Sequence, residues 1–122
     1  MLRVVPFFIL IACTSNSPTG SVCPTSDAPT YGSFGETFFT TYCTDCHSAT
    51  SRNRHGAPGD VNLDTIDDIR SHADDIDLES ASGPKATNTD MPELDTNVPT
   101  APTMAEREML GEFIACVKAG NN

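Results

Sequence analysis

The five residues CTDCH at positions 43–47 constrain this chain more than any other stretch of its sequence. Two cysteines three positions apart can each form a thioether bond with a vinyl group of one porphyrin, and the histidine that follows is then held beneath the iron. We therefore interpret Cys43, Cys46 and His47 as the attachment site of one covalent haem c. His47 is the expected first axial ligand of the iron.

C-x-x-C pairs also occur in disulfide exchange and in zinc sites, so these chemistries compete with haem attachment. A structural zinc site needs further ligands, and the sequence has no second C-x-x-C and no H-x-x-x-H pair. A thioredoxin-like motif follows a strand, whereas the residues before Cys43 have a helical pattern. Haem attachment is the preferred interpretation, and redox or metal use of the two thiols is the alternative.

The amino terminus resembles an export signal of a bacterial lipoprotein. Arg3 precedes a short apolar run at 4–12, which contains too few residues to span a bilayer. The residues LIAC at 10–13 resemble a lipobox, in which cleavage before the cysteine accompanies lipid addition to its sulfur. We expect a signal peptide at 1–12, a lipid on Cys13, and a place in the bacterial cell envelope facing the periplasm or exterior. Ordinary signal cleavage with a free Cys13 is the alternative.

The remaining cysteines suggest a disulfide. The chain has five cysteines, and assigning Cys13 to lipid and two to haem leaves Cys23 and Cys116. In an oxidising compartment outside the cytoplasm, two such cysteines are more often joined than free. The count therefore predicts a disulfide between Cys23 and Cys116.

Length and charge limit the architecture and the partners. A chain of 122 residues has room for one small domain, and a net charge of −10 without a basic stripe argues against nucleic-acid binding. A redox donor or acceptor with a basic docking surface suits such an acidic chain better. Residues 13–32 are rich in Ser, Thr, Pro and Asn, which predicts a flexible tether between the lipid and a domain at 33–120.

Two capping-box patterns mark the first and last helices. The serine and glutamate of SFGE at 33–36 have this spacing, and apolar residues follow at helical intervals. They predict a helix from about 34 to 43 that ends at the first haem cysteine. The residues TMAE at 103–106 repeat the pattern and predict a terminal helix from about 104 to 118.

The middle of the chain is polar and acidic. Residues 48–59 contain Gly and Pro and predict a loop beside the haem. Asp64 is a candidate cap for a short helix to about residue 73, with a further turn or helix over 76–81. The carboxylates at 64–79 lack EF-hand spacing, so a solvated or partner-facing acidic surface is favoured over a cation site.

Met91 is the expected second axial ligand. It lies in a polar loop, where core packing explains a methionine poorly, and Pro92 restricts its backbone toward extended shapes. A thioether is a soft, neutral donor that favours ferrous iron and raises the reduction potential. His72 and Met104 are the main alternatives, while His55 lies too close in sequence to the first ligand.

In this order, the motifs resemble a class I c-type cytochrome over about residues 34–119. The resemblance implies an all-α fold, a small cytochrome c-like helical domain wrapped around one haem. It also implies that the first and last helices cross where Gly35 and Phe39 meet Leu110 and Phe113.

The resemblance further implies a role for Pro58, whose carbonyl would accept the second ring proton of His47 and fix its tautomer. The chain departs from the family pattern elsewhere. The region between Pro58 and Met91 has no close match, and Cys23 and Cys116 lie outside the general pattern.

An iron with two axial ligands has no open position for substrate, so one-electron exchange is its accessible chemistry. We expect a membrane-anchored electron carrier that is not an enzyme on its own. The alternatives are a haem sensor or peroxidase-like protein with an open or labile iron, and a haem subunit of a larger oxidoreductase.

Overall fold

The computed structural model describes residues 16–121, so the expected signal peptide and Cys13 lie outside the described part of the chain. Within residues 16–121 the backbone forms helices and no strand, apart from an isolated bridge between Ser82 and Thr87. The expected all-α class is confirmed. The elements are the π-helical turn η1 (Tyr31–Gly35) and the α-helices α1 (Glu36–Tyr42), α2 (Ile66–Ser71), α3 (Ala73–Ser80) and α4 (Met104–Lys118).

The first helix begins earlier than the sequence predicted. Thr30 is its N-cap and exchanges hydrogen bonds with Ser33, so these two residues form the capping box and the Ser33–Glu36 assignment is wrong. Two capping boxes overlap in this stretch of sequence. The Ser33 hydroxyl can act as the N3 partner of an N-cap at Thr30, or as the N-cap of a helix that starts three residues later. The first turn is π-helical before the chain continues as α1.

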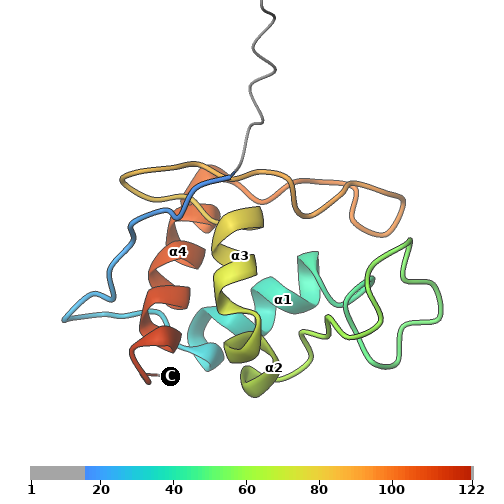
Figure 1. Ribbon diagram of the computed structural model, residues 1–122, viewed down its shortest axis with the longest axis horizontal. Coiled ribbons are helices and arrows are strands. Elements are labelled where there is room, and N and C mark those ends of the chain that lie inside the picture. Colours follow the sequence, from blue (N-terminus) through green and yellow to red (C-terminus); the bar gives the residue numbers. More distant parts are fainter. Residues whose placement is uncertain (1–15, 122) are drawn as a thin grey trace, which may run out of the picture.

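The terminal helix has the predicted bounds, Met104–Lys118. Thr103 accepts a hydrogen bond from the Glu106 backbone, and the Glu106 carboxylate accepts one from the Thr103 backbone, as the capping box predicts. The buried face of α4 packs against α3 and η1. Figure 1 shows α4 and α3 lying beside each other, with α1 crossing below them.

Gly35 allows the first and last helices to approach closely. A Cβ placed on Gly35 would lie 2.8 Å from Cζ of Phe113, a separation that would force the ring to move. Phe39 and Phe113 are buried with ring centroids 6.2 Å apart, and Leu110 is fully buried in the same cluster. The structure therefore brings together the four residues expected at the helix crossing.

The described part of the expected tether is packed against the domain. We call residues 16–30 the N-terminal strap; in Figure 1 it runs beside α3 and α4. Thr19 is buried, and its amide and hydroxyl donate to the Asp77 carboxylate at 3.0 and 2.6 Å. Cys23 and Cys116 form the disulfide that the cysteine count predicted. The flexible-tether interpretation is therefore wrong for residues 16–30, because polar residues there have specific partners on the domain.

Two short helices occupy the acidic middle segment. Thr65 caps α2 and exchanges hydrogen bonds with Asp68, so Asp64 is not the cap. Asp64 instead accepts a hydrogen bond from the amide of Ala49 and joins the loop after α1 to the start of α2. None of the helices in residues 16–121 is long and apolar enough to cross a bilayer.

Candidate functional site

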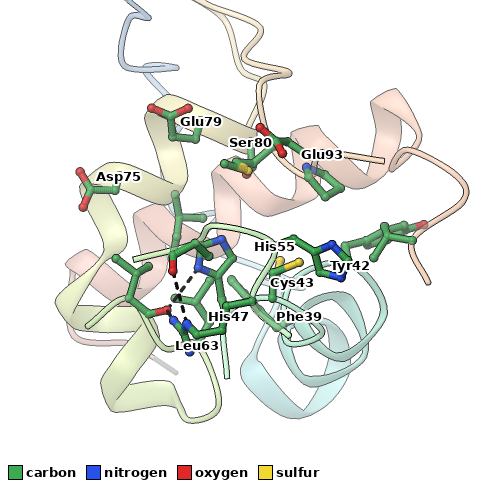
Figure 2. A pocket seen from close by; sticks show the side chains of 18 of the residues that line it. Phe39, Tyr42, Cys43, His47, His55, Leu63, Asp75, Glu79, Ser80 and Glu93 are labelled. Atoms are coloured by element: carbon green, nitrogen blue, oxygen red, sulfur yellow. Dashed lines mark hydrogen bonds between the residues drawn. The ribbon is translucent and has the colours of Figure 1, made fainter. Parts of the chain in front are cut away.

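A cavity of about 590 Å³ lies between the helices and two long loops. We call residues 43–65 the His47 loop, which joins α1 to α2, and residues 81–103 the Met91 loop, which joins α3 to α4. Figure 2 shows Cys43, His47 and Leu63 on one side of the cavity and Ser80 of α3 and Glu93 on another. Its wall includes all five residues expected to contact haem, namely Cys43, Cys46, His47, Pro58 and Met91.

The wall is largely apolar on the side of the helices. Phe38 and Phe39 of α1 and Ile76 of α3 line the cavity, and Leu63 and Val98 line it from the two loops. All five side chains are otherwise buried in the core. The site therefore combines an apolar wall with a small number of sulfur and nitrogen donors, which is typical of a cofactor pocket.

The two thiols of the motif face this cavity as free cysteines. The turn that presents them is closed by the amide of His47, which donates to the Cys43 carbonyl at 2.8 Å. Burial raises the pKa of the Cys43 thiol to about 12. Burial, and then the nearby Asp45 carboxylate, raises the pKa of Cys46. Both thiols are therefore protonated at neutral pH, unlike the activated thiolate of a disulfide oxidoreductase.

His47 is oriented by a backbone carbonyl of its own loop. Its Nδ1 lies 3.2 Å from the Val61 oxygen, and because a carbonyl can only accept, Nδ1 carries the proton. Burial lowers the pKa of His47, which favours the neutral imidazole. Nε2 is then left with a free lone pair, the form in which histidine binds a metal.

The carbonyl that orients His47 belongs to Val61 and not to Pro58, so the role predicted for Pro58 is wrong. The Pro58 oxygen instead accepts from Nη2 of Arg54 at 2.6 Å. Arg54 also donates to the carbonyls of Val61 and Ser48, at 2.7 and 2.5 Å, and so holds the His47 loop closed. The resemblance failed at this point because a proline after the motif does not fix which nearby carbonyl faces the ring.

Met91 lines the same cavity as His47 but belongs to the other long loop. Its amide donates to the Glu79 carbonyl at 2.9 Å, and its side chain lines the cavity. Of the rival ligands, His72 and His55 also line the cavity, whereas Met104 is half exposed and is not part of the wall. The geometry therefore keeps Met91, His72 and His55 at the cavity and gives no support to Met104.

Arg107 is a buried residue that binds the Met91 loop behind the cavity wall, and the sequence analysis missed it. Its side chain is 3 % exposed, and Nη1 donates to the carbonyls of Ser80, Asn88 and Met91 at 2.6, 3.1 and 2.9 Å. A signal was present in the sequence. Arg107 precedes Leu110 by three positions, so it lies on the apolar face of the terminal helix, where a charged residue needs buried partners.

A second cluster of donors lies beside the attachment motif. Ligand atoms of Asp45, Cys46, His55 and Asp95 all lie within 4.8 Å of one another. Nε2 of His55 is 3.5 Å from the Asp95 carboxylate. The amides of Asn97 and Val98 lower the pKa of Asp95, mainly through their hydrogen bonds, so this carboxylate stays ionised. Histidine, cysteine and carboxylate together are suitable ligands for zinc and similar divalent ions.

The cavity wall is also acidic at its solvent side. Asp75 and Glu79 project from α3 and Glu93 from the Met91 loop, as Figure 2 shows. Arg54 also lines the wall, but its guanidinium is bonded to loop carbonyls. Nδ1 of His72 lies 3.8 Å from the Asp75 carboxylate, whereas no described residue forms an ion pair with Glu79 or Glu93. The excess of carboxylates gives this side a negative potential, which attracts cationic surfaces.

Comparisons with known proteins gave no relative. A scan against protein-family models found no match, and searches of the curated proteins and of the solved structures found none.

Proposed function

We propose that this chain binds one haem c through Cys43 and Cys46 and transfers single electrons, with His47 and Met91 as axial ligands. One observation carries the proposal: the cavity brings Met91, from a separate loop, to the same space as the attachment motif. The two segments are more than 40 residues apart in the chain, so their meeting does not follow from local sequence.

The residues of the cavity fit such a group. A volume of about 590 Å³ is within the range of ~300–1,000 Å³ typical of sites for organic ligands. The Cys43 and Cys46 thiols are free, and they would hold the haem through thioether bonds to its vinyl groups. When bound, the haem supplies an iron that exchanges one electron between its ferric and ferrous states.

The chain's own groups would hold that iron in fixed surroundings. The Val61 carbonyl holds the His47 proton on Nδ1, and apolar residues such as Phe39 and Leu63 line the cavity. If His47 and Met91 both hold the iron, no position remains for substrate, and electron exchange would be favoured. The same protein could act as a free carrier or as the haem subunit of a larger oxidoreductase.

The optical spectrum of the holoprotein tests ligation. We expect the weak sulfur-to-iron band of methionine ligation in the ferric protein and no carbon monoxide binding in the ferrous protein. Met91→Ala should remove the band and open the iron, while the matched control Met104→Ala should leave both unchanged, since Met104 is not part of the wall. Ready carbon monoxide binding by the unmutated protein would favour a sensor or a peroxidase-like catalyst instead.

Covalent attachment is tested separately. The double variant Cys43→Ala, Cys46→Ala should lose haem staining on a denaturing gel, whereas Cys23→Ser, Cys116→Ser should retain it. Staining that persists in the first variant would disprove attachment through this motif.

A divalent metal site is the second candidate function, and the cluster of Asp45, Cys46, His55 and Asp95 favours it. Such a site would use the Cys46 sulfur, so it competes with thioether formation. Zinc titration of the haem-free protein distinguishes the two: tight binding that His55→Ala and Asp95→Asn both abolish, in a protein that never acquires haem, would favour the metal site.

We also propose that lipid on Cys13 anchors the protein in the cell envelope of a bacterium. Cys13→Ser should move the protein from the membrane fraction to the soluble fraction.

The acidic side of the cavity supports a redox donor or acceptor with a basic surface. Electron transfer should then slow as salt rises, because salt screens the attraction over about 10 Å at 0.1 M. A rate that is insensitive to salt would indicate apolar docking.

A further inference from the structure

We infer that Arg107 is a positioning residue for Met91, holding the backbone of the Met91 loop so that Met91 stays at the cavity wall. This inference rests on the proposed function, because Met91 must be an axial ligand for its position to matter to the iron. The residue belongs to α4, outside the loops that supply the expected ligands, and it is not part of the cavity wall.

The contacts fix both backbone polar groups of Met91. Its carbonyl accepts from Nη1 of Arg107 at 2.9 Å, while its amide donates to the Glu79 carbonyl at 2.9 Å. The same nitrogen of Arg107 reaches the carbonyls of Ser80 and Asn88. One guanidinium therefore ties the end of α3, the middle of the Met91 loop and α4 into a single unit.

The Met91 loop needs such a connection because it has little structure of its own. Residues 81–103 contain no helix, and their only bridge joins Ser82 to Thr87. Without such contacts a long segment adopts many conformations. Each additional conformation lowers the fraction of molecules in which Met91 lies at the cavity.

Arginine suits this position better than lysine. Three carbonyls from separate segments accept from a single nitrogen of Arg107, Nη1. The rigid, planar guanidinium holds this nitrogen in one orientation, whereas a lysine ammonium lies at the end of a flexible stem. No described residue forms an ion pair with Arg107, and burial lowers the pKa of its guanidinium. The positive charge is thus balanced by carbonyl dipoles, an arrangement that stabilises only one placement of the loop.

The test uses the holoprotein and imidazole, which competes with Met91 for the iron. Arg107→Lys retains the charge but loses the rigid planar group that places the donor nitrogen among the three carbonyls, so we expect imidazole to bind about tenfold more tightly and the sulfur-to-iron band to weaken. Arg107→Gln provides the same test if Arg107→Lys does not accumulate. The control is Ile114→Ala, because Ile114 is buried on the same helix and does not line the cavity.

The outcomes separate the inference from the proposed function. Tighter imidazole binding in the Arg107 variant, with no change in Ile114→Ala, supports the positioning role. Equal affinity in the variant and the unmutated protein overturns the role while leaving Met91 ligation intact. Equal gains in the variant and the control also overturn it, because general loosening then explains the effect. Absence of the sulfur-to-iron band in the unmutated protein overturns both.

Discussion

Two arginines hold the two loops of the cavity, and they do so over different distances along the chain. Arg54 binds carbonyls of its own loop, from Ser48 to Val61, none more than seven positions away. Arg107 binds carbonyls that lie 16, 19 and 27 positions away. Arg54 is partly exposed, whereas Arg107 is buried. The His47 loop is therefore closed locally, and the Met91 loop is held by the tertiary fold.

This difference indicates which half of the site depends on global stability. Local contacts can form as soon as their loop is ordered, whereas distant contacts persist only while the elements that carry them remain packed. The N-terminal strap belongs to the second kind, because Thr19 binds Asp77 and the disulfide joins Cys23 to α4. We expect perturbations of the fold to reach the Met91 loop first.

Removal of the disulfide should have the largest effect. Cys23 and Cys116 are 93 positions apart, so Cys23→Ser with Cys116→Ser should lower the free energy of unfolding by about 4 kcal/mol. Urea denaturation measures this loss. Hydrogen exchange should accelerate more in the Met91 loop than in the His47 loop; equal acceleration in both would contradict the comparison.

Lysine substitutions at the two arginines compare directly how much each arginine contributes to stability. Arg107→Lys should cost about 3 kcal/mol of unfolding free energy, because the flexible ammonium stem no longer places its donors against all three buried carbonyls. Arg54→Lys should cost about 1 kcal/mol, since water can replace the donor in a partly exposed loop. Paired urea curves test this order, and the comparison fails if Arg54→Lys proves the more costly change.

Loss of the buried Thr19 hydroxyl should lower the unfolding free energy by less than loss of the disulfide or the Arg107 substitution. Thr19→Val removes the donor at 2.6 Å from the Asp77 carboxylate and should cost about 2 kcal/mol. Thr41→Val is the matched control, because the exposed Thr41 hydroxyl donates only to a carbonyl of its own helix. Thermal unfolding of both variants would show whether the strap stabilises the domain; equal melting temperatures would show that it does not.

The smallest effect should come from the cap of α4. Thr103→Ala should cost about 1 kcal/mol of unfolding free energy at neutral pH.

The carboxylate of Glu106 makes the stability of the same cap depend on pH. The hydrogen bond from the Thr103 backbone amide is the main cause of the lowered pKa of Glu106. The stabilisation that the ionised carboxylate provides is complete above its ordinary pKa of 4.5 and is lost as pH falls through the lower pKa of the folded protein. Glu106→Gln should therefore flatten stability over that acidic range, as urea denaturation at several pH values can check. Unchanged pH dependence would assign acid sensitivity to other carboxylates.

Local patterns predicted much of the helical structure. The capping box at Thr103 and Glu106 fixed the start of α4, because both partners lie within one turn and nothing else competes for them. The resemblance placed Gly35 against Phe113 correctly, since a small residue facing an aromatic ring leaves a recognisable pattern. The attachment motif likewise needs only adjacent residues to be recognised.

Features that depend on distant partners were missed. The strap was interpreted as a flexible tether because its polar composition does not indicate that Thr19 binds Asp77. The position of Arg107 on the apolar face of α4 signals a buried charge, but its acceptors are backbone carbonyls, which every residue carries, so the sequence does not show which segments it binds. The error at Pro58 has a related cause, since the choice between its carbonyl and that of Val61 depends on loop geometry.

The path of the strap also limits how an anchored protein could search for partners. Asn16 donates to Asp90, the neighbour of Met91, and only three peptide steps separate Asn16 from Cys13. Those steps span at most about 10 Å. With lipid on Cys13, as proposed, the domain would stay at the bilayer surface with its Met91 loop nearest the lipid, and it would meet its partners by diffusion in two dimensions.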